Sequence, residues 1–328
     1  MKSPFTGKEM ERVYEKRMWN FRGEQYEYIH SAWRCVDTGE EFTEDADDTA
    51  AFVQVTNKYR NKYGIPYKDQ IIDIRKLYDI SAAKMSLILG MGANQYRLYE
   101  IGEVPSISNG RLILAIMKPE VMLSMIESAK NVLSKSEYEK ILEKTYKVIK
   151  TYPNKAEEYD TSRVFTVPRG EENGYAKQSL VHLKNIMLYI LDHCSNVWYT
   201  KMNKLLFYAD FLSYREYGMA MTGLSYRAIN YGPVPEKWER VYSEFQEINQ
   251  DLSKAGNYTG YILTSSEKPN LSVISEEERQ ILDVVCTKFG QSTSKKLSES
   301  SHCENAWLLH HENHERIPFE DAFQLTAI

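Results

Sequence analysis

The feature of this sequence that most constrains its fold is a run of short amphipathic segments between residues 69 and 150. Their apolar residues recur at every third or fourth position, which places them on one face of a helix. Ser81 can cap one such helix, and Pro119 can occupy the first turn of another. Gly90 and Gly92 interrupt the pattern, as residues in a turn between two helices do. The pattern predicts several short packed helices.

Charge is unevenly distributed along the 328 residues, although the formal net charge is only -5. Residues 51–118 contain ten Lys or Arg against five Asp or Glu, so this segment carries +5 and the remainder carries -10. A basic segment on an acidic chain is typical of a module that binds a polyanion such as DNA. The same helices could instead form a solvated packing unit that binds no DNA.

The rest of the chain divides by composition. Residues 1–48 alternate aromatic and polar positions between glycine-bearing turns and predict a small β-rich module. Residues 49–118 form the basic helical domain, and residues 119–150 add two packing helices. Residues 151–177 contain two prolines, two glycines and nine charged residues, which predict a linker. Residues 178–328 predict a mostly helical domain with a small β-sheet, so the expected fold class is mainly α.

Hydropathy and cysteine usage indicate where the protein resides. No apolar run approaches the roughly 20 residues that span a bilayer, and the first 20 residues lack the basic-then-apolar order of a signal peptide. The four cysteines are widely scattered, which fits a reducing compartment. We expect a cytoplasmic protein that makes no membrane contact.

The segment around Gly90 has the features of a DNA major-groove reader. Two short helices with a break are followed by a helix whose outer face is polar, and the major groove admits one helix. If Tyr96 and Tyr99 face the core, the residues beside them face outward. Asn and Gln can pair with adenine, and Arg with guanine or phosphate. The candidate DNA contacts are Lys84, Asn94, Gln95, Arg97 and Leu98.

A family resemblance supports this interpretation. The segment from Ile71 to Pro105 resembles the XRE (Cro-type) helix-turn-helix, a five-helix type of DNA-binding domain. The string Gly-Ala-Asn-Gln-Tyr-Arg-Leu-Tyr-Glu, which begins at Gly92, is similar to the version in MqsA/YgiT-type antitoxins. The resemblance implies that Asn94 reads a base. In that family an Arg immediately before Tyr-Glu also contacts DNA. Leu98 occupies that position here, and Arg97 lies one place earlier.

Two turns near the N-terminus resemble the zinc-binding turns of MqsA/YgiT-type proteins. They are Ser3-Pro4-Phe5-Thr6-Gly7 and Cys35-Val36-Asp37-Thr38-Gly39, and they keep the frame but only one of four cysteines. Hydroxyls are poor substitutes for thiolates around zinc. We therefore expect a degenerate, metal-free zinc-ribbon-like module held by apolar contacts, with five candidate aromatic residues: Trp19, Phe21, Tyr26, Tyr28 and Trp33.

Three blocks in the C-terminal half resemble the SocA-like Panacea domain. They begin at Lys201, Tyr226 and His302 and follow the expected order across most of residues 178–325. The resemblance implies a domain that binds and neutralises a partner toxin. The candidate toxin contacts are Tyr208, Asp210, Tyr231, Gly232, Pro233, His302, Glu304 and Trp307. The Tyr-Gly-Pro-Val-Pro turn could instead serve only to shape the backbone.

Motifs for catalysis or metal binding are missing from the sequence. It contains no phosphate-binding loop, no nucleophile elbow and no His-Glu-x-x-His. His310 and His314 could share a helical face as metal ligands, or could belong to a solvated or locally hydrogen-bonded set. We expect no enzymatic activity, no metal and no cofactor.

Together these observations predict the antitoxin of a type II toxin–antitoxin system. Its C-terminal domain would bind a cognate toxin, and its helix-turn-helix would repress its own operon on operator DNA. We expect a homodimer, because one such module contacts too little DNA for tight specific binding. The alternatives are a phage-type transcriptional regulator without a toxin partner and a proteolytic adaptor for a toxin.

Overall fold

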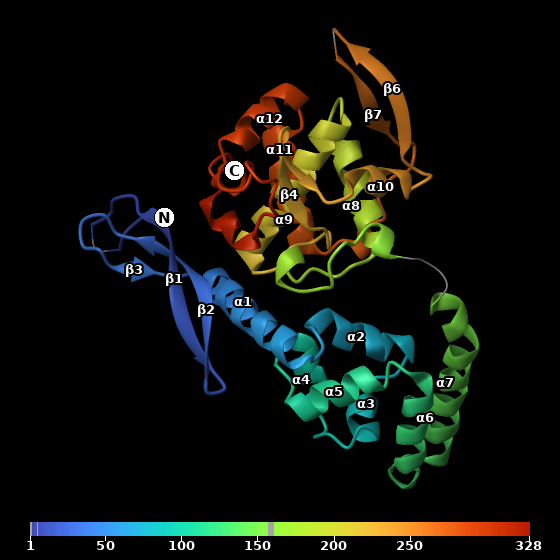
Figure 1. Ribbon diagram of the computed structural model, residues 1–328. Coiled ribbons are helices and arrows are strands. Elements are labelled where there is room, and N and C mark those ends of the chain that lie inside the picture. Colours follow the sequence, from blue (N-terminus) through green and yellow to red (C-terminus); the bar gives the residue numbers. More distant parts are fainter. Residues whose placement is uncertain (1, 5, 157–160, 257) are drawn as a thin grey trace. The chain divides into compact units, whose positions relative to one another are not determined.

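The computed structural model describes residues 2–4, 6–156, 161–256 and 258–328 (Figure 1). Two compact units make up the chain: one contains Met1–Val55 and Thr161–Ile328, and the other contains Thr56–Asp160. Helices predominate and the sheets are small and antiparallel, so the predicted mainly α fold class is confirmed. Among the described residues, no helix is long and apolar enough to cross a membrane.

The N-terminal module is a β-hairpin with a short third strand. Strands β1 (Glu11–Phe21) and β2 (Glu24–Arg34) pair antiparallel, and β3 (Glu41–Phe42) adds to β2. Arg22 and Gly23 form the two-residue turn with positive φ angles of 54° and 85°, which suits the twist of a hairpin. Helix α1 (Asp45–Tyr63) follows. Acidic residues in its first turn stabilise the helix through a favourable interaction with the helix dipole.

The unit from Thr56 to Asp160 contains the predicted short helices. Ser81 caps its helix by accepting a hydrogen bond from Lys84 N, and Pro119 occupies the first turn of another. The elements of this unit are α2 (Lys68–Leu77), α3 (Ala82–Ile88), α4 (Gln95–Ile101), α5 (Ile107–Ala115), α6 (Pro119–Ser128), η1 (Lys130–Val132) and α7 (Lys135–Ala156).

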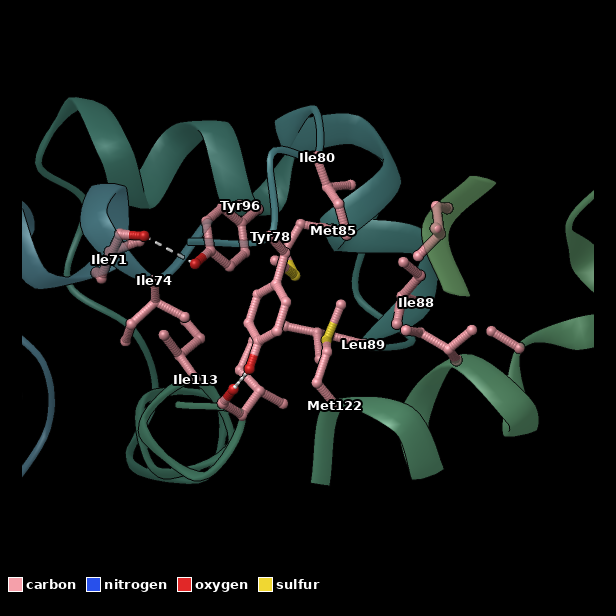
Figure 2. Packing of buried hydrophobic residues seen from close by; sticks show 14 of the residues in the cluster. Ile71, Ile74, Tyr78, Ile80, Met85, Ile88, Leu89, Tyr96, Ile113 and Met122 are labelled. Carbon is pink, nitrogen blue, oxygen red and sulfur yellow. Dashed lines mark hydrogen bonds between the residues drawn. The ribbon is translucent and has the colours of Figure 1, made fainter. Parts of the chain in front are cut away.

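Two buried tyrosines organise the core of this unit (Figure 2). Tyr78 donates its hydroxyl hydrogen bond to the carbonyl oxygen of Ile116, and Tyr96 donates to that of Ile71 at 2.8 Å. Both rings are fully buried among aliphatic side chains of several helices. Each hydroxyl therefore meets an acceptor inside the core, which avoids the cost of an unpaired buried polar group.

The C-terminal part is built around α9 (Tyr199–Tyr217), in which every residue from Lys201 to Tyr214 is buried. Helix α9 packs against α8, α11, α12, β5, β7 and η5. The elements around it are η2 (Thr161–Arg163), η3 (Glu171–Asn173), α8 (Leu180–His193), β4 (Tyr226–Ile229), β5 (Gly232–Pro235), α10 (Trp238–Ser243), β6 (Asn249–Ala255), β7 (Tyr258–Thr264), η4 (Leu271–Val273), α11 (Glu276–Phe289), α12 (Ser294–His302), α13 (Asn305–Leu308) and η5 (Phe319–Gln324).

The segment predicted as a linker, residues 151–177, is mostly ordered structure. Helix α7 continues to Ala156, and residues 157–160 lie outside the described part of the chain. From Val164 onward five apolar side chains are buried in the C-terminal part: Val164, Phe165, Val167, Tyr175 and Ala176. Around these buried residues the charged side chains Arg163, Glu171, Glu172 and Lys177 are exposed.

The N-terminal module and the C-terminal part form one unit, whereas composition predicted separate domains. Tyr14 of β1 lies edge-on to Phe323 with ring centroids 5.5 Å apart. Lys16 contacts Glu320 at 3.0 Å. Gly218, at the end of α9, lies directly against the backbone of α1. These contacts join residues about 170 to 310 positions apart, which sequence composition does not encode.

Gly218 provides a test of this packing. Its φ is +69°, and an added Cβ would lie 2.6 Å from the carbonyl oxygen of Ala50. We expect Gly218→Ala to lower the free energy of unfolding by about 2–4 kcal/mol, because backbone strain and overlap both contribute. Gly39 is the matched control, since its φ is +73° and the described residues leave the space around its added Cβ open. Gly39→Ala should cost only about 1–2 kcal/mol in urea denaturation. Equal losses would contradict the close approach.

Candidate functional site

Helix α4 is held by hydrogen bonds that orient its two faces. Its backbone N–H at Tyr96 donates to Ser86 Oγ of α3 at 3.0 Å, and Asn109 of α5 donates to the Tyr99 hydroxyl at 2.9 Å. Tyr96 is fully buried and Tyr99 nearly so, which is the orientation that the sequence analysis assumed. Burial raises the pKa of Tyr96, so its phenol stays neutral. The opposite face of α4 is consequently turned to solvent.

The predicted DNA contacts on this helix lie on that solvent face. Asn94, Arg97 and Leu98 are exposed, and Gln95 is half-buried with its Nε2 donating to Glu103 Oε1 at 3.0 Å. These four residues therefore share one accessible surface at the start of α4. An exposed amide, guanidinium and short apolar side chain on one short helix can contact base edges and phosphates.

Lys84, the fifth predicted DNA contact, lies on α3 rather than on α4. Its Nζ lies 2.5 Å from Glu137 Oε1 of α7, and this contact lowers the pKa of Glu137 to about 2. Lys84 therefore faces α7 and pairs with a carboxylate rather than lying on the face of α4. Residues 53 positions apart meet here, a pairing that local sequence pattern does not reveal.

The two N-terminal turns have matching backbone geometry. Ser3 O accepts from Gly7 N at 2.9 Å, and Cys35 O accepts from Gly39 N at 2.8 Å. The glycines have φ angles of +71° and +73°. The turns also approach each other, because Thr6 Oγ1 lies 3.7 Å from Cys35 Sγ.

The side chains that these turns bring together do not fit zinc. They supply one thiol from Cys35 and hydroxyls from Ser3, Thr6 and Thr38, whereas tetrahedral zinc sites use thiolates and imidazoles. Hydrogen bonds from Ser3 and then Thr38 lower the pKa of Cys35 to about 6. Phe5 of the first turn lies outside the described residues. The two turns are thus joined by contacts between hydroxyl groups and a thiol.

Buried polar groups tie α9 to the segments around it. The Asp210 carboxylate accepts hydrogen bonds from the backbone N–H of Met221 and of Thr222, both at 2.8 Å, and from the Tyr226 hydroxyl at 2.6 Å. Lys201 Nζ donates to the carbonyl oxygens of Ser195 and Gly290, both at 2.7 Å. A buried charge that is fully hydrogen-bonded fixes the backbone that supplies its partners.

The Tyr-Gly-Pro-Val-Pro turn rests on a buried lysine. Lys204 Nζ donates to Pro233 O at 2.9 Å, and burial lowers the pKa of this amine to about 7. A Cβ on Gly232 would lie 2.7 Å from both Lys204 Cε and Ser301 Oγ, and the φ of Gly232 is +100°. Only glycine fits between the hairpin and this lysine. Tyr231, one residue earlier, is 73% exposed at the tip of the β4–β5 hairpin.

Glu304 anchors the end of the chain. Its carboxylate accepts from the backbone N–H of Thr326 at 2.8 Å and of Ala327 at 3.0 Å, and from the Tyr208 hydroxyl at 3.2 Å. Glu304 and Tyr208 are both fully buried. Their role in this structure is to hold the C-terminal residues against α9.

Five of the eight predicted toxin contacts are therefore inaccessible to a partner. Tyr208, Asp210, Gly232, Pro233 and Glu304 are buried, and they shape the fold. The three that reach the surface lie at the hairpin tip, at the end of α12 and on α13: Tyr231, His302 and Trp307.

Those three residues belong to an aromatic surface that we call the hairpin-tip face. His302, Trp307 and His311 stack in order, with ring centroids 4.2 Å and 4.1 Å apart. Trp307 donates its indole N–H to Ile229 O of β4 at 2.8 Å, which joins α13 to the hairpin. Sequence reasoning missed His311, which continues this stack, and the two residues after Trp307, since Leu308 and Leu309 are 46% and 64% exposed. Two adjacent leucines after Trp307 were the available signal.

The remaining histidines near the C-terminus make local hydrogen bonds. His310 Nε2 lies 2.9 Å from Asp321 Oδ2, and His314 Nε2 lies 2.9 Å from Asn230 Oδ1. Within the described residues, no group of three or more His, Cys, Asp or Glu side chains is placed to hold a metal ion. The hydrogen-bonded alternative thus describes these two histidines.

Comparison with known proteins identifies the class of the C-terminal region. Residues 202–308 match the family model described as Antitoxin SocA-like, Panacea domain. The match covers α9 from Met202 onward, including Lys204, the β4–β5 hairpin, and the hairpin-tip residues Tyr231, His302 and Trp307. It supports an antitoxin role in general for this region, which is about one third of the chain. Searches of curated proteins and of solved structures found no match.

The buried amine of Lys204 predicts a specific pH dependence. Between about pH 7 and pH 10 the unfolded chain keeps an amine proton that the folded chain has lost, so stability should rise with pH. The rise should approach about 1.4 kcal/mol per pH unit in mid-window. In Lys204→Met this contribution should be absent. Urea denaturation of both proteins at pH 6, 7.5 and 9 measures the difference, and parallel curves would show that the amine is not desolvated.

Proposed function

We propose that this protein is an antitoxin that binds a toxin through its hairpin-tip face and binds operator DNA through α4. The observation that carries the proposal is the match of residues 202–308 to an antitoxin domain whose exposed aromatic residues rest on a rigid buried frame. Both activities are binding: the stability of each complex performs the inhibition or the repression, and no bond is made or broken. We place the protein in the cytoplasm, where toxin and operon both reside.

The support for DNA binding comes from α2 to α5. We interpret α3 and α4 as a helix-turn-helix in which α4 enters the major groove, because its outer face carries Asn94 and Arg97. The basic surplus of residues 51–118 supplies the attraction to phosphates. Buried Tyr96 and Tyr99 fix the rotation of α4, so the outer side chains do not have to be ordered on binding.

Arg97→Ala tests the DNA-binding proposal. On a duplex from upstream of the protein's own gene, we expect a loss of about 1–3 kcal/mol in affinity and a salt dependence reduced by about one phosphate contact. Fluorescence anisotropy at several salt concentrations measures both quantities. Lys288→Ala is the control, since it removes one exposed charge from α11. If the wild type leaves the duplex unbound at low salt, or if both variants behave alike, α4 is not the reading helix.

The support for toxin binding is the chemistry of the hairpin-tip face. An exposed tyrosine, Tyr231, close to a half-buried tryptophan, Trp307, is typical of the central residues of protein interfaces. Lys204 and the Trp307 hydrogen bond hold the face in place before a partner arrives. Such a preformed surface binds with a small loss of conformational entropy. Covering the active or substrate surface of a toxin is sufficient to neutralise it.

Tyr231→Ala tests the toxin-binding proposal in cells. When the adjacent gene product is expressed and arrests growth, the wild-type chain should restore growth and form a stable complex. Tyr231→Ala should weaken that complex about thirty-fold or more, as truncation of a central interface tyrosine does. Leu252→Ala is the control, because Leu252 is similarly exposed at 68% on β6. A neighbouring product that is harmless alone would remove the basis of the antitoxin proposal, and one that disappears when both proteins are present would favour the adaptor alternative.

A further inference from the structure

Two exposed apolar residues lie on the outer face of α4. Leu98 is 39% exposed and Ile101 is 68% exposed. They stand three positions apart on one short helix, so their side chains are neighbours along its surface. Buried Tyr96 and Tyr99 hold the opposite face of α4 in the core, which turns both apolar side chains outward. Ile101 is a residue that the sequence pattern did not single out.

Polar residues of the same face flank this pair. Asn94 precedes Leu98 by about one helical turn, and Arg97 adjoins Leu98; both polar residues are exposed. Glu100, the acidic residue of α4, is paired with Arg75 of α2. The outer face of α4 therefore combines an amide, a cation and two apolar side chains.

The exposed charges of this unit favour a polyanion as the occupant of the face. Between residues 51 and 118, six exposed side chains are basic and three are acidic: Lys62, Lys68, Lys76, Arg97, Arg111 and Lys118 against Asp73, Asp79 and Glu103. Two of these carboxylates have partners. Lys144 Nζ lies 2.8 Å from Asp79 Oδ2. Glu103 accepts a hydrogen bond from Gln95. A DNA duplex complements the remaining positive charge.

The major groove of DNA limits what an apolar side chain can recognise. Its base edges present the C5 methyl group of thymine among hydrogen-bond donors and acceptors. A leucine or isoleucine placed on that methyl group removes apolar surface from water. Over a G·C pair, the same side chain would desolvate donors and acceptors without replacing their hydrogen bonds. Leu98 and Ile101 therefore suit contact with thymine.

We propose that Leu98 and Ile101 recognise thymine in the operator, each by contact with the C5 methyl group of a base in the major groove. This inference rests on the proposed binding of DNA by α4, and it adds the base that the apolar residues of this helix select. The buried tyrosines hold the rotation of α4. A missing methyl group would therefore leave a gap that the helix does not fill by turning.

Replacement of thymine by deoxyuridine tests the inference with the full chain. Copying the DNA upstream of the protein's own gene with dUTP in place of dTTP removes every C5 methyl group and leaves the phosphates and hydrogen-bonding groups unchanged. Wild-type affinity, measured by fluorescence anisotropy, should fall about four-fold for each methyl contact, which corresponds to roughly 0.8 kcal/mol per buried group of this size. Two contacts should give about fifteen-fold in total. The salt dependence should not change, because no phosphate contact is lost.

Protein variants separate a methyl contact from an effect of deoxyuridine on the shape of the DNA, which all variants would share. Leu98→Ala should reduce the difference between the two duplexes to about four-fold, and Leu98→Ala combined with Ile101→Ala should reduce it to within about two-fold. Val132→Ala is the control, because Val132 is 62% exposed on η1 of the same unit. This variant should keep the full wild-type difference.

The outcomes distinguish this inference from the proposed function. A wild-type chain that binds both duplexes equally would overturn the recognition of thymine and leave the proposed binding of DNA standing. A double variant that keeps the wild-type difference would do the same, because the methyl dependence would then come from the shape of the DNA. A wild-type chain that leaves the thymine duplex unbound at low salt would reject DNA binding and this inference together.

Discussion

The burial of α9 on all sides is the constraint on which the C-terminal part depends. A helix surrounded by protein must satisfy every polar side chain internally, because water cannot reach it. Lys201, Lys204 and Asp210 do so by contacting backbone groups of the surrounding loops and hairpin. Each contact fixes a segment far away in sequence. Helix α9 is therefore the centre of the core, and its side chains also fix the positions of the loops around it.

This constraint explains why residues of a recognisable motif need not touch a partner. Charged and aromatic residues in a recognisable sequence motif suggest a binding site. The carboxylates of Asp210 and Glu304, however, accept hydrogen bonds from backbone N–H groups inside the domain. What the buried frame presents outward is the neighbouring Tyr231 and the stack around Trp307. The buried, hydrogen-bonded residues therefore hold the exposed hairpin-tip face in a fixed position.

Sequence pattern predicted the helices well and the long-range pairings poorly. Ser81 and Pro119 correctly marked the starts of α3 and α6, because helix-start signals are local. The orientation of α4 followed from its two tyrosines. By contrast, Lys84 pairing with Glu137 and the packing of residues 164–176 depend on the tertiary fold. The composition of this segment suggested a linker, because the number of charged residues does not show which side chains between them are buried.

The same distinction applies to electrostatics in the helical unit. Net charge determines the long-range potential that attracts DNA, and a local ion pair leaves that sum unchanged. Contact with a phosphate, however, requires a cation that no carboxylate already holds. Lys84 and Arg75 are each paired with a glutamate, on α7 and α4 respectively, whereas Arg97 lies exposed on the outer face of α4. Under the proposed function, the basic surplus would attract this unit to DNA, and Arg97 would be an exposed cation on the outer face of α4 that can contact a phosphate or a base.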